Sequence, residues 1–463
     1  MVLHAPELEK SLGIEVYATG SPGIGGVIRR RVEDFIVEEV LVDGSKATTS
    51  VSENHVDHKA LGSASQRQRY LLCVLIKRNW DTFSSLKAVA HQLYVKTNRV
   101  QIAGIKDAKA VTAQYITVEG VSPQQIQEVK VKDIKLRPMG YLHRKLSSYY
   151  LQGNRFHIII RELCHPKSEI RERAKKTFEE LKNVGGAPNF FGHQRFGTVR
   201  PITHQVGKAL INQNVEEAAM LFLAEPSLHE HPEARQARQE LLKTQDFEKA
   251  LKAFPKQLRY ERWMLKHLTE RSDDFPGAFR RLPFKLRQLF PQAYQSFLFN
   301  KFLSRRIEKK LCLDKVEVGD YVVNVERSGL PMLRMRRMVT ADKMREINVS
   351  VRAGKQRLAI PLVGFKQDLS KGVQGEIERR ILEEEGVSPL SFKSEAMPET
   401  SLRGTLRTAL TPTDGLSLNE IKKDDLNLSK LKAEASFMLH RGSYATILLR
   451  ELMKPSEVIA AGF

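Results

Sequence analysis

An aspartate beside a lysine stands in the stretch from Ala103 to Gln114, just before a run rich in β-branched residues. Gly104 permits a turn that a Cβ would hinder, and the run from Tyr115 to Val118 favours a strand. Asp107 is therefore predicted to lie on a turn at the head of a strand. A cation such as Lys106 next to it would hold the carboxylate ionised, as a nucleophile requires. The same residues are also typical of an aspartate that only caps its own turn.

Four further motifs combine aromatic, amide and charged side chains that could hold a nucleotide. In chain order they are Glu33-Asp34-Phe35 followed by Val37 and Glu38, Gly153-Asn154-Arg155-Phe156, Asn189-Phe190-Phe191-Gly192-His193-Gln194-Arg195-Phe196-Gly197, and Arg441-Gly442-Ser443-Tyr444-Ala445-Thr446 running into Leu449-Arg450-Glu451-Leu452. With Gly104-Ile105-Lys106-Asp107 they resemble the motifs of TruD-type tRNA pseudouridine synthases and stand in the same order. The resemblance covers nearly the whole chain, and the long middle segment is similar to that of archaeal or eukaryotic members.

The resemblance implies that Asp107 is the catalytic nucleophile, that Lys106 supports it, and that the target nucleotide is held by Phe35, Asn154, Phe156 and Tyr444. An aromatic side chain stacks on a base, and an Asn amide offers the donor and the acceptor that a uracil edge requires. Most other pseudouridine synthase families carry Tyr where Phe156 stands. The expected role of Phe156 is therefore stacking and exclusion of water, without proton transfer.

Each of these contacts also has a purely structural interpretation. Phe35 lies in an alternating segment that is typical of a core-facing strand aromatic, and Asn154 suits a turn at a strand mouth. Tyr444 follows Gly442-Ser443, which resembles a hairpin turn, so it could form a cross-strand aromatic pair. The residues by themselves leave both interpretations open.

The family's reaction converts a uridine of tRNA, the one at position 13, into pseudouridine. The N1 glycosidic bond breaks, the base turns, and a new bond forms through C5. The resemblance implies neither a metal nor another cofactor. The chemistry requires a carboxylate that attacks and then leaves, a base taken out of its stack, and a closed pocket that retains the detached uracil.

The charge balance favours a polyanionic partner, which the resemblance identifies as tRNA. Lys and Arg number 75 against 54 Asp and Glu, so the formal net charge is +21 and the pI is about 9.7. Lysines and arginines that contact phosphates release condensed counterions, which drives binding to nucleic acid. A highly charged solvated surface is the plain alternative, and charge alone does not distinguish RNA from DNA.

Other features argue against a membrane protein, a secreted protein and a protein built on disulfides or zinc. The longest apolar run, from Tyr70 to Ile76, is far too short to span a bilayer, and no signal peptide is apparent. Three widely spaced cysteines argue against a disulfide framework and a zinc site, and fit a reducing cytoplasm. His55 and His58 lack a third ligand nearby and are interpreted as loop histidines. We expect a cytoplasmic monomer.

The order of elements predicts an α+β fold with a mixed or antiparallel sheet. The resemblance implies that this sheet is of the pseudouridine synthase type and is interrupted by a largely helical insert. We predict a first catalytic part at 1–185, the insert at 186–418, and closing strands at 419–463. Strands are expected at Val27–Val42, Arg69–Lys77, Val100–Ile102, Val131–Arg137, His157–Arg161, Ala433–His440 and Ser443–Arg450. Helices are expected after Asp81, at Ser168–Val184 and, within the insert, at His204–Asn212, Val215–Leu223, Pro232–Phe254 and Pro283–Leu311.

The insert carries basic clusters with interleaved aromatics such as Tyr260 and Trp263, a pattern that suits phosphate tracking with occasional base stacking. The residues expected to contact RNA are Arg195, Arg200, Arg259 and Arg262. A solvated helical face explains any single cluster equally well.

A second function class is a basic RNA-binding protein that keeps the scaffold without catalysis. It predicts salt-sensitive binding and no product, and the intact Asp107 motif argues against it. A methyltransferase would require a nucleotide loop after a strand. The Gly23–Gly26 cluster precedes its predicted strand, so it does not meet that requirement.

Overall fold

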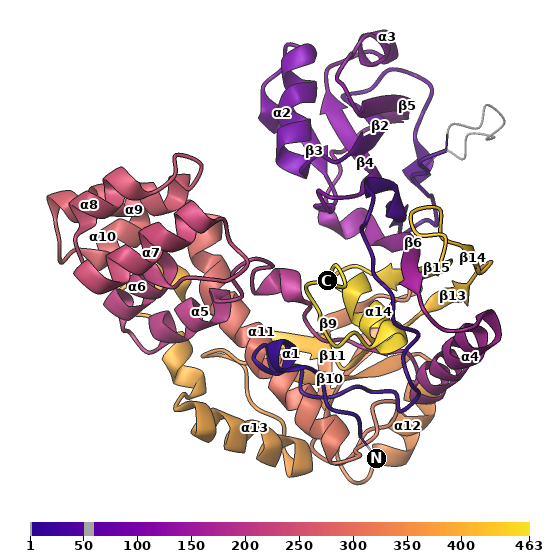
Figure 1. The fold of residues 1–463 in the computed structure, drawn as a ribbon. Helices are drawn as coiled ribbons and strands as arrows, with labels where there is room; N and C mark the ends of the chain where they lie inside the picture. The colour runs from indigo at the N-terminus through magenta and orange to yellow at the C-terminus, as the bar shows by residue number, and fades with distance from the viewer. Residues whose placement is uncertain (1, 51–59) are drawn as a thin grey trace. The chain divides into compact units, whose positions relative to one another are not determined.

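The computed structural model describes residues 2–50 and 60–463, so the predicted loop histidines His55 and His58 lie outside the described residues. Contacts divide the chain into a sheet unit, residues 21–187, 326–330 and 411–463, and a helical unit, residues 1–20, 188–325 and 331–410. Within the described ranges, no helix is long and apolar enough to cross a membrane. Figure 1 shows the elements of both units.

The sheet unit is built on nine strands of the described chain, in the order β13-β15-β6-β1-β4-β2-β5, with β14 on β15 and β3 on β4. β1 and β4 run parallel, and the other pairs run antiparallel. The predicted mixed sheet is therefore confirmed. The strands are β1 (Phe35–Leu41), β2 (Tyr70–Arg78), β3 (Val100–Ile102), β4 (Val111–Glu119), β5 (Ile134–Leu142), β6 (Leu151–Leu163), β13 (Asp414–Leu418), β14 (Lys422–Lys423) and β15 (Leu431–His440).

Helix α2 (Thr82–Gln92) covers one end of this sheet (Figure 1). It begins where predicted, because the Asp81 side chain accepts a hydrogen bond from the Ser84 amide and so caps the helix. Its apolar side, with Leu86 and Val89, packs in one cluster with Cys73, Leu75 and Ile116 of β2 and β4. This packing fixes the position of the chain that leads into the Asp107 turn.

At the other end of the sheet, α4 (Lys167–Val184) and α14 (Ala445–Met453) pack on each other. α4 ends at Gly185, which adopts φ 91° as a left-handed cap. The predicted strand Ser443–Arg450 is wrong, because this segment forms α14. Every residue of α14 is buried, including Arg450 and Glu451, which pair with each other at 2.7 Å, so the helix has no solvent-facing polar side to mark it in the sequence.

The predicted strand Val27–Val42 is also too long. A short 3-10 turn at Val32–Asp34 interrupts it, and β1 starts at Phe35. The Asp34 carboxylate accepts a hydrogen bond from the Arg31 amide at 2.7 Å and pairs with the buried Arg161 at 2.8 Å. A buried ion pair thus holds the turn that leads into β1.

The helical unit consists of a group of helices around one apolar core and a small sheet in the order β11-β10-β8-β9. Its strands are β8 (Tyr321–Val325), β9 (Pro331–Met338), β10 (Gln356–Leu362) and β11 (Thr405–Thr408). Its principal helices are α1 (Glu7–Lys10), α5 (Thr203–Ile211), α6 (Val215–Ala224), α7 (Pro232–Thr244), α8 (Phe247–Ala253), α9 (Arg259–Glu270), α10 (Phe275–Arg280), α11 (Phe284–Glu308), α12 (Met344–Arg352) and α13 (Gly372–Glu385).

The single helix predicted at Pro232–Phe254 is in fact two, α7 and α8. Gln245 adopts φ 52° and ends α7, and the Asp246 side chain then accepts a hydrogen bond from the Lys249 amide to start α8. An N-cap aspartate in the middle of a periodic stretch is the signal that the prediction overlooked.

The contacts of two segments differ from the predicted domain boundaries. Residues 1–20 were assigned to the catalytic part but belong to the helical unit, where Leu12 and Gly13 carbonyls accept hydrogen bonds from Asn300 and Ser304 of α11. Residues 411–418 were assigned to the insert but belong to the sheet unit, because β13 pairs with β15. The α+β architecture itself is as predicted.

Candidate active site

The pairing register of the central strands places several predicted residues on one face of the sheet. Val37 of β1 lies opposite Phe156 of β6, and Phe156 lies opposite Phe437 of β15. Directly opposed residues point to the same face, and every second residue of a strand follows them. Phe35 and Glu39 of β1 and Asn154 of β6 therefore share this face. α2 covers this same face further along. Lys77 is aligned through Thr112 with Val37, and Cys73 and Leu75, which pack against α2, lie four and two residues before Lys77 and so point to the same side.

The Asp107 loop, residues 103–110, joins β3 to β4 and is held by side chains from neighbouring elements. The buried Lys77 ammonium donates to the carbonyls of Asp107 at 2.7 Å and Trp80 at 2.6 Å. The Thr82 hydroxyl, at the start of α2, bonds both the amide and the carbonyl of Lys106 at 3.0 and 3.2 Å. Gln114 of β4 donates to the Gly104 carbonyl at 3.1 Å. The loop backbone is thereby fixed from three sides.

The cation beside the Asp107 carboxylate is Arg29. Its Nη2 lies 3.3 Å from Asp107 Oδ1, and the Asp107 side chain is 36% exposed. The guanidinium also lies over the Phe35 ring, 4.1 Å from the centroid. Burial lowers the pKa of Arg29, and Asp107 opposes this effect. Arg29 adopts φ 59°, a strained backbone for a residue with a side chain, and no local pattern predicted its place in the site.

The expectation that Lys106 lies beside the Asp107 carboxylate is wrong. Lys106 is buried, and its ammonium pairs with Glu39 at 2.6 Å. The other carboxylate oxygen of Glu39 accepts a hydrogen bond from the Tyr115 amide at 2.8 Å. Adjacent residues on an extended loop point in opposite directions, so Lys106 anchors the loop to β1 while Asp107 faces outward.

Three phenylalanines form an aromatic cluster on the same face, and one of them was not predicted. Phe35 and Phe156 meet edge to face with centroids 6.2 Å apart, and Phe156 stacks on Phe437 at 5.3 Å. All three rings are buried. Phe437 lies in the predicted strand Ala433–His440, but its cross-strand partner could not be known before the register of β15 on β6.

Several buried polar atoms of this region lack a hydrogen-bond partner among the described residues. They are Arg29 Nε, Thr112 Oγ1, Gln114 Oε1 and Asn154 Oδ1. Buried polar atoms are normally satisfied, so each unsatisfied one requires an explanation. Both donors and acceptors are represented here, as a planar heterocycle with polar edges requires. Asn154 was predicted to bind the nucleotide, whereas Thr112 and Gln114 were only part of the quoted motif.

Tyr444 directly precedes α14 and is half-buried, so it does not belong to a β-hairpin. Gly442 adopts φ 83° in the turn between β15 and α14. The predicted turn is present, but it joins a strand to a helix.

Three of the four arginines predicted to contact RNA are engaged inside the helical unit. Arg200 donates to the carbonyls of Leu221 and Phe222, and burial lowers its pKa to about 10. Arg262 donates to the carbonyls of Leu251 and Phe254 at the end of α8. Both guanidinium groups satisfy helix-terminal carbonyls, which is a structural role, and their contact with RNA stays a prediction.

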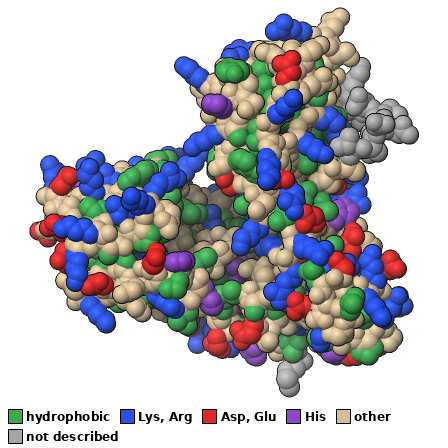
Figure 2. Space-filling view, turned by 45° about the horizontal axis from the view of Figure 1, so that its top comes forward, with side chains coloured by type: hydrophobic (Ala, Val, Ile, Leu, Met, Phe, Trp, Pro, Cys, Tyr) green, Lys and Arg blue, Asp and Glu red, His purple; other side chains and the backbone are tan. Residues whose placement is uncertain are grey.

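Of the other two predicted arginines, Arg195 is engaged in hydrogen bonds and Arg259 is exposed. Arg195 donates to Ser296 and Gln292 of α11 at 3.1 and 3.3 Å. Arg259 is exposed, next to Tyr260 and Trp263, whose rings meet edge to face at 5.4 Å. Figure 2 shows Lys and Arg side chains spread over the visible surface rather than gathered in one patch.

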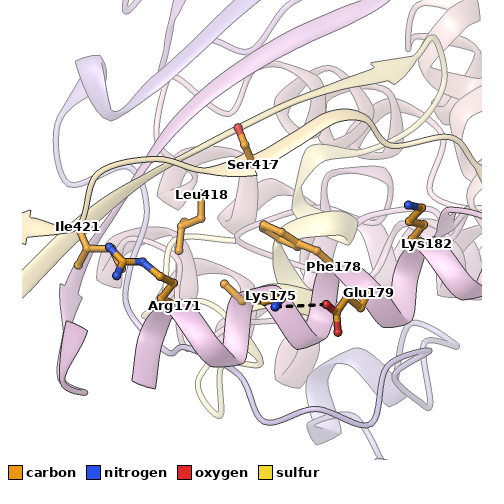
Figure 3. Close-up of a pocket in the computed structure, with 9 residues that line it drawn as sticks. Arg171, Lys175, Phe178, Glu179, Lys182, Ser417, Leu418 and Ile421 are labelled. Atoms are coloured by element: carbon orange, nitrogen blue, oxygen red, sulfur yellow. Dashed lines mark ion pairs between the residues drawn. The ribbon is translucent and has the colours of Figure 1, made fainter. Parts of the chain in front are cut away.

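The sheet unit also contains an apolar groove that is lined by a different set of residues (Figure 3). It is formed by α4 and β13, with Ala174, Phe178 and Leu418 among its apolar residues. The nearby Lys175 and Glu179 pair with each other at 3.9 Å. None of the groups around Asp107 lines it. Over the residues that the structure describes, no cluster of three or more His, Cys, Asp or Glu could hold a metal ion.

Comparisons with known proteins identify the family of the chain and its fold. The model of the family "tRNA pseudouridine synthase D (TruD)" matches residues 11–452. The chain is 39% identical to a probable tRNA pseudouridine synthase D of Methanosarcina barkeri, with 98% of each chain covered. It is 37% identical to the probable enzyme of Thermococcus sibiricus, with 95% of this chain and 97% of that protein covered.

A solved structure is similar over the same extent. The crystal structure of the putative tRNA pseudouridine synthase D from Methanosarcina mazei superposes with a TM-score of 0.82 and 38% identity. The match covers 97% of this chain and 98% of that one. The α+β fold described above is thus the fold of that structure.

Proposed function

The chain belongs to the TruD family of tRNA pseudouridine synthases, and on that premise we propose that it isomerises a uridine of tRNA, the one at position 13, with Asp107 as the nucleophile. The observation that carries this proposal is the half-exposed Asp107 carboxylate paired with Arg29, whose guanidinium lies on the ring of Phe35. The structure thus brings together a carboxylate, its counter-cation and an aromatic ring, with 3.3 Å between the charged groups and 4.1 Å from the guanidinium to the ring centroid. No cofactor enters the proposed reaction.

The proposed reaction needs Asp107 to be ionised before substrate binds. An opposite charge within about 4–6 Å favours the ionised form of a carboxylate, and Arg29 at 3.3 Å supplies it. The carboxylate attacks the target nucleotide at the ribose or the base. The N1–C1′ bond breaks, the uracil turns, a C5–C1′ bond forms, and the bond to Asp107 breaks so that the carboxylate is regenerated. C5 loses its proton and N1 gains one, so the product is an isomer of the substrate.

The surroundings of Asp107 suit a single uracil that has left its stack. Phe35, Phe156 and Phe437 form a buried apolar cluster, with Phe35 directly under the Arg29 guanidinium, and such a cluster excludes water from the neighbourhood of the base. Phe156 has no ionisable proton, so it takes no part in proton transfer. Asn154 Oδ1 and Gln114 Oε1 are acceptors without a partner among the described residues, and the N3–H of uracil is a donor of the required kind.

The test is conversion of uridine to pseudouridine in purified tRNA by the wild type and by Asp107→Asn. We expect a rate at least about 10³-fold lower for the variant, because an amide cannot act as the nucleophile, with tRNA binding retained. Asp133→Asn, which alters an aspartate on a turn before β5, is the matched control and should stay active. Appreciable turnover by a folded Asp107→Asn protein would remove the nucleophile assignment.

A transcript with cytidine at position 13 tests the target. We expect no product from it, and product elsewhere in that transcript would change the assigned position but not the activity. Absence of product with wild-type protein on any tRNA, together with tight salt-sensitive binding, would favour the non-catalytic RNA-binding alternative.

A further inference from the structure

The exposed side of α2 carries aromatic and basic side chains in one stripe. Phe83, Lys87 and His91 are each four residues apart, which turns the helix only about 40° per step, and Tyr94 follows in the turn after the helix. Phe83 is 53% exposed and Tyr94 is 95% exposed, and Lys87 and His91 are also exposed. The helix contains no acidic residue. The stripe therefore combines aromatic rings with the cation of Lys87 and the imidazole of His91, while the N-cap Asp81 before it accepts a hydrogen bond from the Ser84 amide.

The backbone at Tyr94 is in a conformation that its side chain disfavours. Tyr94 adopts φ 54°, and its amide bonds the His91 carbonyl while the Val95 amide bonds the Ala90 carbonyl. This is a Schellman ending of α2, in which the left-handed position is usually Gly because a Cβ is strained there. A ring that is 95% exposed contributes little packing in return. Folding alone therefore does not account for tyrosine at this position.

The start of the stripe is tied to the Asp107 loop. Thr82, the residue before Phe83, bonds the backbone of Lys106, the residue before Asp107. Ile105 in the same loop is 65% exposed. A chain of exposed apolar and basic residues thus leads from the loop along α2, within one packed part of the sheet unit.

We propose that this stripe binds the RNA strand next to the target nucleotide, with the Tyr94 ring stacking on an unpaired base and Lys87 and His91 contacting phosphates. The inference rests on the proposed function for the identity of the RNA. RNA is the occupant that the charge favours, because the stripe has two basic groups and no acid on a chain of net charge +21. The 11 residues of α2 span roughly 16 Å, enough to follow several nucleotides.

The test measures the equilibrium dissociation constant for tRNA, independently of activity, together with thermal unfolding. For Tyr94→Gly we expect a dissociation constant raised at least about fivefold, since loss of one stacked base is of this size or larger. The melting temperature should rise, because Gly relieves the left-handed strain. A variant that is more stable yet binds less tightly cannot be explained by damage to the fold.

Two further variants make the result specific. Lys87→Ala should reduce the slope of log affinity against log salt by about one, as expected for one lost phosphate contact. Gln92→Ala changes an exposed residue of the same helix about 180° from Phe83. It should leave the dissociation constant for tRNA and its salt dependence unchanged. Unchanged tRNA affinity in Tyr94→Gly and Lys87→Ala would overturn the proposal and favour a protein partner. Failure of the proposed function would show instead as absence of product from the wild type.

Discussion

At the scale of single residues, the surroundings of Asp107 combine two cations with different tasks. Arg29 faces the carboxylate, whereas Lys77 lies under the loop and donates to the Asp107 carbonyl. Lys77 is fully buried, and burial lowers its pKa to about 8, with Asp107 opposing the shift. The positive charge that reaches the loop from below is therefore sensitive to pH close to neutrality.

The first prediction concerns this lysine. Below pH 8 Lys77 is protonated and supports the ionised Asp107, and above pH 8 it becomes neutral. We expect kcat/KM of the wild type to decline above pH 8, by up to about tenfold per pH unit if only the protonated form is active. Lys77→Met should be less active at pH 7 and should lack this alkaline limb. The same limb in a folded Lys77→Met protein would assign it to another group.

The stability of the fold should change with pH in the opposite sense. The folded pKa of Lys77 lies below the usual 10.5, so between about pH 8 and 10.5 the unfolded chain binds more protons at this residue. Its contribution to the free energy of unfolding therefore rises with pH across this window. Comparing urea unfolding of the wild type and Lys77→Met at pH 7.5 and pH 10 separates the effect on stability from the effect on catalysis.

Site residues that belong to a recognisable sequence motif were predicted. Site residues that reach Asp107 only through tertiary contacts were not. The motif around Asp107 identified the turn before β4, and the Asn154 motif identified a residue on the same face of the sheet. Arg29 and Phe437 join the site through tertiary contacts, 78 residues from Asp107 in one case and through the pairing of β15 with β6 in the other. Spacing along the chain carries no information about such contacts.

At the scale of elements, the Asp107 loop depends on the buried pair between Lys106 and Glu39. The pair is 2.6 Å long and almost completely shielded from water, and Glu39 also holds the Tyr115 amide of β4. Removing one partner leaves an uncompensated buried charge. The pair therefore links β1, β4 and the loop, which explains why a lysine next to the proposed nucleophile points away from it.

The second prediction is a double-mutant cycle on this pair. Lys106→Met should lower the free energy of unfolding by about 3–5 kcal/mol. Adding Glu39→Gln, which removes the charge but keeps an acceptor for the Tyr115 amide, should restore about 1–3 kcal/mol. Urea unfolding measures both. The exposed pair of Lys252 and Glu248 is the control and should show little coupling. Additive effects at Lys106 and Glu39 would contradict the linking role.

Elements were predicted well where one side is apolar and poorly where burial is complete. α2 and α4 have an apolar side, and the predicted start of α2 and both predicted limits of α4 agree closely with the structure. α14 is buried all round, and its β-branched Thr446 and Ile447 suggested a strand instead. The division of Pro232–Phe254 into α7 and α8 occurs at the left-handed Gln245, and its one signal in the sequence is the N-cap Asp246 that follows.

At the scale of the whole molecule, the chain returns to the sheet unit after the long helical unit, because β15 pairs with β6. The alternation of β15 and the TruD-type motifs together predicted this return. The exact division did not follow from sequence, since residues 1–20 join the helical unit through hydrogen bonds to α11. Contacts of that kind link positions nearly 290 residues apart and leave no local pattern.

The charge of the whole chain carries the last prediction. Because the excess of positive side chains is spread over the visible surface (Figure 2) and totals +21, tRNA binding should release many counterions. We expect log affinity to fall linearly with log salt, with a loss of about 10³-fold between 50 and 200 mM if six or more phosphates are contacted.

Salt should act on KM far more than on kcat. Once tRNA is bound, Asp107 and Arg29 act at a separation of 3.3 Å, well inside the screening length of about 10 Å at 0.1 M salt. Single-turnover rates at saturating tRNA should therefore stay within about twofold over the same range. A duplex RNA of equal length should show a similar salt slope without product, because phosphates alone set that slope. Affinity that is insensitive to salt would mean that tRNA is held by base and shape contacts, and that the positive charge serves another purpose.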